Sequence, residues 1–472
     1  MKIALILPKR RLRRWHGELA AALAERGTLS SFMREDGGDP LCLRLLLAAE
    51  RFLSRGAFDA PMPVTWDGAE DWADGFDVVV NLTGDGDPAR LGELRLRFDG
   101  QPGEAYLLGR LLSRRPPLIE VVDGEGCAVA ASYAALETPL ELGRSIDQIG
   151  RRIVALVVRA LEGSQRSTET DPVPRRQATK PSCRAVIGFG AARVAAQLAG
   201  ADRPLWQVAI RPVTEGLPRS GGDWSVHPTG FLADPCLHAR CGAVTLFGEA
   251  LDATAKRGRI VCASVSADGA LGEFRTVLQA AHHLSYPFVF DHDGEVFMIP
   301  ETGATHRVEL YRAVDYPTRW AQEAVLIEGP KLVDATLLHR GGLWWMFAGG
   351  AEHGDSAHDQ LFLYYSEGLM GPWLRHPLWP LKSDCRGSRP AGRLLELEGR
   401  LYRPSQNNEL RYGGGLVWSE VLELTPETYR EQVVTRWSGL DFGHFDGVHS
   451  FSRAGGIEAV DLLRLRPAIS PP

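Results

Sequence analysis

The apolar residues of the first 162 positions alternate between short continuous runs and runs with helical spacing. Continuous apolar runs at 2–8, 76–82 and 116–122 predict buried strands. Apolar positions three or four apart at 14–27 and 145–163 predict amphipathic helices. Strands that alternate with helices are typical of a parallel sheet covered by helices. The pattern therefore predicts an N-terminal α/β domain of Rossmann-like type.

Ligands of such sheets bind beyond the carboxyl ends of the strands. In this domain that rule points to the turn that carries Asn81, Thr83, Gly84 and Asp85. A plain tight turn explains the same residues, so both interpretations stay open.

The hydrophobic pattern changes after residue 200, where short strand-like runs alternate with glycine-containing turns. Five stretches share an apolar strand, a turn glycine and a second strand. The turn glycines are Gly242, Gly294, Gly342, Gly399 and Gly456. They are 52, 48, 57 and 57 residues apart, and strand-rich repeats of about 40–50 residues are typical of propeller blades. We therefore predict an all-β, five-bladed β-propeller over 183–466, with residues 204–212 adding a strand that helps to close the ring.

Residues 163–182 are poor in apolar residues and rich in Ser, Thr, Pro and charge, which predicts a linker between the domains 1–162 and 183–466. Residues 186–200 imitate the start of a dinucleotide-binding motif. Arg193 stands where the pattern G-x-G-x-x-G requires its third glycine. We expect a helix there that leads into the second domain.

Composition narrows the class of partner. The net charge is −6 over 472 residues. The sequence has no basic stripe with interleaved aromatic residues, so we do not expect nucleic acid as a partner. No apolar run approaches the ~18 residues of a membrane span, and the N-terminus lacks the order of a signal peptide. The seven cysteines are scattered, and Cys236 and Cys241 have no second pair that would complete a zinc site. We expect a cytoplasmic protein with no metal or other cofactor, and the sequence leaves its oligomeric state open.

The five hairpins place polar residues at the hairpin end away from the turn. Eight positions before the five turn glycines stand Asp234, Tyr286, Asp334, Ala391 and Val448. Seven positions after the first four turn glycines stand Glu249, Glu301, Gly349 and Gln406. If each first strand is innermost in its blade, these ends meet at one mouth of the central channel. The predicted catalytic residues are Asp234, Asp334, Glu301 and Glu249, and the predicted substrate-binding residues are Tyr286, Arg389, Arg403, Gln406 and His449.

Carboxylates gathered in a partly dry mouth raise one another's pKa. One carboxylic acid can then stay protonated beside an ionised one, which is the division needed for acid–base chemistry on a glycosidic bond. The other interpretation is that single carboxylates cap strand ends or pair with Arg389. Aromatic rings that can stack on a sugar face, or simply pack the blades, are Tyr286, Trp344, Trp345, Trp373 and Tyr412.

Several motifs together carry a resemblance to a known family. They are HLSYPFVFDHDGEVFMIPET at 283–302, LVDATLLHRGGLWWMF at 332–347 and SRPAGRLLELEGRLYRPSQN at 388–407. They resemble the domain at the N-terminus of plant glucosamine inositolphosphorylceramide transferases, which bacterial proteins also carry, often behind a formyltransferase-like segment. The resemblance implies a propeller similar in fold to those of arabinanases, β-xylosidases, invertases and levansucrases. By that resemblance Asp234 matches the acid of the first inner strand and Asp334 the second Asp. The general acid of those enzymes has no clear counterpart in this chain, and we take Glu301 as the first candidate and Glu249 as the second.

The chain departs from the family pattern at several places. It has HPLWPL at 376–381 where the family continues HPxNPV, and SQNN at 405–408 where the family has an acidic residue. The N-terminal half resembles a formyltransferase fold, but the Asn, His and Asp set of that chemistry is not evident. Three functions therefore follow, in order. The first is cleavage or transfer of a glycosidic bond in a saccharide or glycoconjugate. The second is binding of a saccharide or nucleotide sugar without catalysis, and the third is formyl or acyl transfer by the first domain.

Overall fold

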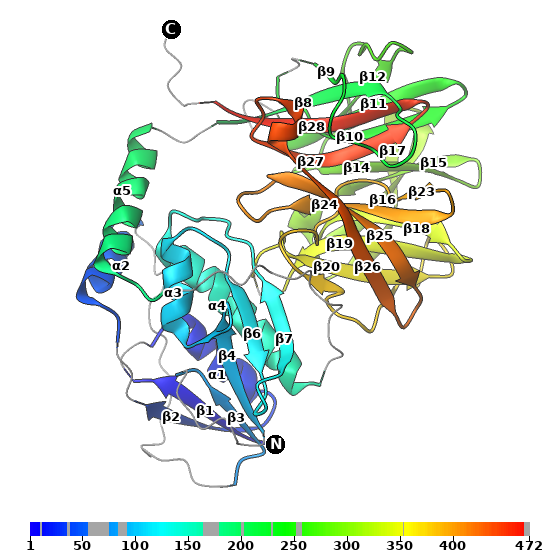
Figure 1. The fold of residues 1–472 in the computed structure, drawn as a ribbon. Helices are drawn as coiled ribbons and strands as arrows, with labels where there is room; N and C mark the ends of the chain where they lie inside the picture. The colour runs from blue at the N-terminus through cyan, green and yellow to red at the C-terminus, as the bar shows by residue number, and fades with distance from the viewer. Residues whose placement is uncertain are drawn as a thin grey trace. The chain divides into compact units, whose positions relative to one another are not determined.

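A computed structural model describes residues 1–9, 12–34, 38–54, 75–83, 92–163, 179–199, 203–227, 230–251, 257–352 and 354–466. The chain divides into two compact units. One comprises Met1–Ala199 with Glu352–Ser356, and the other comprises Gly200–Ala351 with Ala357–Pro472. Each unit is described by itself (Figure 1).

The first unit contains one mixed sheet. Its strand order is β2-β1-β3-β4-β6-β7, with β5 paired to β4. The strands are β1 (Lys2–Pro8), β2 (Thr28–Arg34), β3 (Val78–Asn81), β4 (Glu93–Phe98), β5 (Gln101–Pro102), β6 (Leu118–Val122) and β7 (Ala128–Tyr133). Strands β2, β1, β3 and β4 are parallel to one another, but β6 and β7 are antiparallel to their neighbours. The prediction of an all-parallel sheet is therefore wrong for the strand at 116–122.

A tight turn accounts for this difference. Asp99 and Gly100 have φ angles of 51° and 78°, and they connect β4 to β5 as a two-residue hairpin in which Phe98 pairs with Gln101. Positive φ at both central residues defines the turn type that reverses a strand at once. The chain thus turns back directly after β4, where a parallel neighbour would need a crossover first.

Five helices accompany the sheet in the described part of the first unit. They are α1 (Arg14–Ala24), α2 (Leu41–Ser54), α3 (Glu104–Leu112), α4 (Leu142–Leu161) and α5 (Cys183–Ala199). Helix α4 is buried along most of its length, and Ile146, Ile149 and Ile153 are fully buried in the core of this unit. The predicted helices at 14–27 and 145–163 correspond to α1 and α4.

A helix is expected at 186–200, and its described residues 186–199 are helical. The placement of this helix moves the boundary between the units. Val186 and Phe189 of α5 are buried in the core of the first unit, so the division falls at 199–200 where composition placed it at 183. Residues 164–178 of the predicted linker, and Gly84 and Asp85 of the predicted turn, lie outside the described residues.

The second unit is a five-bladed β-propeller, as the turn glycines predict. It contains five separate sheets, each with a path of four strands. The first two blades are β10 (Ala233–Arg240), β11 (Ala243–Leu251), β12 (Gly258–Val265) and β13 (Arg275–Leu278), then β14 (Ser285–His292), β15 (Glu295–Glu301), β16 (Arg307–Asp315) and β17 (Arg319–Glu328). The next two are β18 (Lys331–Arg340), β19 (Leu343–Ala351), β20 (Gln360–Ser366) and β21 (Leu374–Arg375) with β22 (Lys382–Ser383), then β23 (Leu395–Leu397), β24 (Arg400–Asn407), β25 (Gly415–Leu424) and β26 (Tyr429–Ser438). The fifth is β27 (Gly447–Ala454), β28 (Ile457–Arg466), β8 (Arg203–Pro212) and β9 (Ser225–Val226).

The fifth blade closes the ring with strands from both ends of the unit. Strand β8 pairs with β28 over ten residues, from Arg203 opposite Arg466 to Pro212 opposite Ile457. The predicted closing strand at 204–212 is therefore confirmed. A ring closed in this way leaves only short, protected sheet edges.

All five predicted hairpins use the same turn. Each connects its strands through two residues, and the second residue is the predicted glycine. These five glycines have φ angles between 76° and 82°, and the residues before them also have positive φ. Positive φ at both central positions is the type I′ turn, whose twist matches that of the flanking strands. The regular glycine spacing thus records a backbone requirement that recurs once per blade.

We expect Gly294→Ala to lower the free energy of unfolding of the propeller by about 1 kcal/mol, because an L side chain is strained at a φ of 82°. Nothing lies within 4 Å of the added Cβ, so the cost comes from the backbone alone. Urea unfolding can be followed by tryptophan fluorescence, since nine of the twelve Trp residues follow residue 200. Gly221→Ala is the matched control, because it also meets open space but at an ordinary φ. Equal stability of the two variants would contradict the turn assignment.

Candidate active site

Three polar side chains enter the site through irregular backbone at one end of the inner strands. The pairing of the first three hairpins shifts register at the positions of Asp234, Tyr286 and Asp334. These residues have φ angles of 52°, 42° and 52°. A bulge redirects a side chain, and non-glycine residues with left-handed backbone cost about 1–3 kcal/mol and cluster at functional sites. The positions counted from the turn glycines are therefore structurally equivalent and share a strained conformation.

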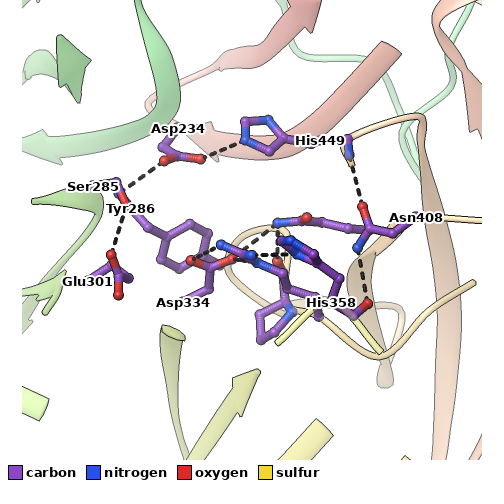
Figure 2. A network of polar contacts seen from close by, with 12 residues as sticks. Asp234, Ser285, Tyr286, Glu301, Asp334, His358, Asn408 and His449 are labelled. Atoms are coloured by element: carbon purple, nitrogen blue, oxygen red, sulfur yellow. Dashed lines mark hydrogen bonds and ion pairs between the residues drawn. The ribbon is translucent and has the colours of Figure 1, made fainter. Parts of the chain in front are cut away.

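Asp234 lies at the centre of one half of the site (Figure 2). Its side chain is buried, its Oδ2 accepts the backbone N–H of Tyr286 at 3.1 Å, and its Oδ1 lies 3.4 Å from His449 Nε2. Burial raises the pKa of Asp234 to about 7, and the carboxylates of Asp461 and Asp334 act in the same direction, while His449 opposes them. Asp234 is thus a carboxyl group that changes its charge near neutral pH.

Asp461 holds His449 from the other side. His449 Nδ1 lies 2.7 Å from Asp461 Oδ2, and Asp461 also accepts the Ser450 hydroxyl at 2.8 Å and the backbone N–H of Asp234 at 2.9 Å. Burial alone would lower the pKa of His449, but the two carboxylates raise it overall. Burial likewise opposes ionisation of Asp461, but His449 and the donated hydrogen bonds lower its pKa. The geometry therefore favours a charged imidazole between two carboxyl groups.

One oxygen or nitrogen from each of Asp234, His449 and Asp461 lies within 4.8 Å of the others, which is close enough to surround a cation. Both ring nitrogens of His449, however, face carboxylate oxygens. A histidine must be neutral to bind a metal, so the three residues fit a proton-linked ion pair better than a metal centre.

Asp334 organises the second half of the site. Arg389 donates two hydrogen bonds to its carboxylate, from Nε to Oδ2 at 2.5 Å and from Nη2 to Oδ1 at 3.2 Å. Gln406 Nε2 donates to the same Oδ2 at 3.1 Å. Arg389 Nη1 also lies 2.8 Å from His358 Nδ1, and burial and the Arg389 charge keep the pKa of His358 well below its usual value. Asp334 is therefore paired with the guanidinium of Arg389, whereas the cation beside Asp234 is the imidazole of His449, which can lose its proton.

The two glutamates stand across the hairpins from the bulges. Glu249 pairs with Ala233, and Glu301 pairs with Ser285. Burial raises the pKa of Glu301, with Asp334 adding to the shift, although Gly303 N–H donates to it at 2.6 Å. Burial also raises the pKa of Glu249 well above its usual value, and Asp234 and Glu301 contribute. The four predicted carboxyl groups are thus close enough to influence one another's charge.

The structure does not bring every predicted residue to this group. Arg403 is buried against Glu431, with Nε 2.8 Å from Oε2 and Nη2 2.7 Å from Oε1. Lys382 reaches the same carboxylate at 2.8 Å. Arg403 is therefore engaged in an ion pair inside the fourth blade, apart from the carboxyl groups. Asp461 is not among the predicted residues, and its only signal in the sequence is an acid in the apolar run IEAVDLL at 457–463.

The aromatic candidates separate in the same way. Trp344 and Trp345 are buried in blade cores, so they pack the fold. Tyr286 is buried with its hydroxyl 2.8 Å from Thr336 Oγ1. Tyr412 is 39% exposed, and the Arg389 guanidinium lies 5.1 Å from its ring centre. Tyr412 is thus the accessible ring beside the carboxyl groups.

Asp234 also lines a pocket between inner strands of the propeller. Its lining comes from the first, second and fifth blades and from the segment before β23. The residues are Asp234, Pro235, Cys236, Tyr286, Pro287, Phe288, Gly392, Arg393, Ser450, Phe451 and Ser452.

Fold and site together define a five-bladed β-propeller with an acidic cluster on its inner strands. Residues 205–439 match the family model described as glucosamine inositolphosphorylceramide transferase 1, N-terminal. A protein of that name from Oryza sativa subsp. japonica is 35% identical over 271 residues, covering 54% of this chain and 36% of the relative. A protein of the same name from Arabidopsis thaliana is 35% identical over 236 residues, and the match covers 46% of this chain and 30% of that relative. The chain thus spans about a third of the length of these curated relatives.

Solved structures are similar at lower identity. A GH43 β-xylosidase/α-arabinofuranosidase from a compost microbial metagenome, in complex with xylotriose, is 15% identical. It covers 50% of this chain and 90% of its own, with a TM-score of 0.36. An α-L-arabinanase from Cellvibrio cellulosa, complexed with arabinohexaose, is 17% identical. The match covers 43% of this chain and 78% of the arabinanase chain, with a TM-score of 0.34.

Removal of the cation that faces Asp334 tests the second half of the site. We expect Arg389→Met to lower the free energy of unfolding by about 3–5 kcal/mol, because it leaves a buried carboxylate unpaired. The control is Arg307→Met, which breaks a surface pair with Glu328 and should cost about 1 kcal/mol or less. Urea unfolding measures both. A loss for Arg389→Met no larger than that of the control would show that Asp334 does not depend on Arg389.

Proposed function

We propose that the propeller is a carbohydrate-active module that binds a saccharide or glycoconjugate over the acidic cluster and cleaves or transfers a glycosidic bond. One observation carries the proposal, namely that carboxyl groups of one cluster occupy opposite electrostatic environments. Asp334 is paired with Arg389, whereas the pKa values of Asp234, Glu249 and Glu301 are raised, first by burial. Glycosidic chemistry needs such a pair, one group protonated and one ionised.

The roles follow from the contacts. Asp234 serves as base or nucleophile, and His449 and the Tyr286 N–H fix the direction of its oxygens. Glu301, or in second place Glu249, donates a proton to the leaving oxygen, and burial raises the pKa of both groups. Asp334, held by Arg389 and Gln406, is the third carboxyl group beside the reacting sugar. Tyr412 offers a ring for the apolar face of a sugar.

The names of the relatives support this class of substrate. They describe the transfer of glucosamine to an inositolphosphorylceramide, so an amino sugar and a charged glycoconjugate are the first ligands to test. We propose a place in glycan biosynthesis in the cytoplasm, as the scattered thiols suggest.

A specific observation favours the second candidate, a saccharide- or nucleotide-sugar-binding protein without turnover. The fourth hairpin has Gln406 where the first two have Glu249 and Glu301, and an amide cannot donate a proton as an acid does. If the fourth blade is where the general acid belongs, the cluster binds a sugar but does not cleave it. Formyl or acyl transfer by a formyltransferase-like first unit is the third candidate, without a site in the described residues to support it.

We expect Asp234→Asn to reduce turnover of an aryl furanoside or pyranoside at least ~10²-fold, because a required acid–base group is lost. Asn tolerates the left-handed backbone of this position, so the fold should persist. Asp293→Asn is the matched control, because Asp293 also has a positive φ, of 48°, but is exposed at a hairpin turn. A binding protein would show no turnover in wild type and weaker saccharide affinity in Asp234→Asn only. Unchanged turnover or affinity in this variant would refute the site.

The pH dependence gives a second test. Asp234 must be ionised to act as a base, and its pKa is raised to about 7, so kcat/KM should fall as the pH drops through that value. It should fall again on the high-pH side of its maximum, when the acid that donates the proton ionises. Burial raises the pKa of both candidates for that acid, Glu249 and Glu301. Initial rates over a pH series measure both limbs. Constant kcat/KM between about pH 5 and pH 8 would contradict the assignment of Asp234 as the base.

A further inference from the structure

Figure 1 shows where helices α2 and α5 lie in the first unit. Each of them exposes three large apolar side chains. The exposed fractions on α2 are 62% for Leu41, 61% for Leu45 and 85% for Phe52. On α5 they are 69% for Ile187, 53% for Val194 and 77% for Leu198. We call these six residues the apolar face. Scattered single apolar residues are normal on a surface, but a contiguous apolar patch marks an interaction site.

Two contacts show that the helices run side by side in the same direction. The sulfur atoms of Cys42 and Cys183, near the first residues of α2 and α5, are 3.1 Å apart. Further along both helices, Arg193 of α5 forms an ion pair with Glu50 of α2. The exposed side chains of both helices therefore belong to one pair of parallel helices.

The opposite faces of these helices are firmly anchored. Leu43 and Leu47 of α2 and Val186 and Phe189 of α5 are at most 5% exposed, within the core of the first unit. Both helices therefore have apolar residues on two sides. Packing in the core of the first unit explains the apolar residues on the buried side. It does not explain the six exposed residues of the apolar face.

The exposed charged residues of α2 and α5 are all basic. Arg44 and Arg184 are exposed, and the only acidic residue of the two helices is Glu50. Glu50 is buried, and it accepts the backbone N–H groups of Leu142 and Gly143 at 3.1 and 2.8 Å. The whole chain has more acidic than basic residues, 59 against 53. This surface is thus apolar and cationic on a protein of net negative charge.

We propose that the apolar face docks on the surface of a bilayer that contains anionic lipid. The six apolar side chains enter the boundary between headgroups and acyl chains, and the exposed arginines contact lipid phosphates and carboxylates. Helices of 14 and 17 residues are shorter than the ~20 residues needed to span a bilayer, so the pair lies in the plane of the interface. The proposal does not depend on the saccharide site.

Charge argues against a second copy of the chain as the occupant. A two-fold interface brings the same patch of both copies together. It would place arginines opposite arginines, with no exposed acid of α2 or α5 to balance them. An anionic bilayer supplies the missing charge along the whole length of both helices.

Flotation with lipid vesicles tests the proposal on the full chain. Vesicles of phosphatidylcholine and phosphatidylserine in equal amounts should carry the wild type to the top of a density gradient, and vesicles of phosphatidylcholine alone should carry far less. The double variant Leu45→Glu with Leu198→Glu should lose flotation. Leu374→Glu with Leu440→Glu is the matched control, since these leucines are 52% and 76% exposed elsewhere in the chain, and it should float like the wild type.

A second pair of substitutions separates charge from apolar contact. Arg44→Gln and Arg184→Gln should each weaken binding to the anionic vesicles roughly five-fold. Added salt should weaken wild-type binding as well. All variants change exposed residues, and circular dichroism verifies that they fold. Absence of wild-type flotation with anionic vesicles, equal binding to both vesicle types, or a dimer that Leu45→Glu with Leu198→Glu dissociates without vesicle binding would each overturn the proposal.

Discussion

The pairing of β8 with β28 is the interaction on which the propeller and its acidic cluster depend. This ladder joins the first strand of the second unit to its last strand and thereby completes the fifth blade. Asp461 lies on β28 opposite Val208 of β8, and its carboxylate accepts the backbone N–H of Asp234 in the first blade. His449 on β27 stacks on Trp206 of β8, with ring centres 4.0 Å apart. The blade that closes the ring therefore also fixes the half of the cluster that contains Asp234.

The acidic cluster contains two buried ion pairs. One pair joins Asp461 to His449, and the other joins Asp334 to Arg389. Buried ion pairs are weak evidence for stability, because the cost of desolvation offsets the attraction. What they provide is a defined geometry, since each fixes an oxygen or nitrogen that faces the remaining carboxyl groups. Asp234, Glu249 and Glu301 are left with raised pKa values in this fixed surrounding.

Sequence patterns predicted the parts of the structure that follow a local rule. The turn glycines revealed the five hairpins because a type I′ turn requires positive φ, and counting from them found Asp234, Asp334, Glu249 and Glu301 at equivalent places. Arg403 does not come from that count, since it stands four positions after Gly399, and its side chain pairs with Glu431 inside the fourth blade. Asp461 was missed because its partners, His449 and Asp234, come from other strands, and no local pattern encodes that contact. The packing of α5 on the first unit depends on long-range contacts in the same way. The antiparallel direction of β6 follows instead from the tight turn at Asp99 and Gly100, which the sequence analysis does not identify.

The direction of the closing ladder has a mechanical consequence. Strands β8 and β28 are antiparallel, and Arg203 at the start of one lies opposite Arg466 at the end of the other. A force that pulls the chain apart at these two residues loads the hydrogen bonds one pair at a time, as in the opening of a zipper. Tension at the two ends of the propeller would therefore peel the fifth blade open from that edge, while the other four blades, whose strands are consecutive in the chain, would carry no load at first.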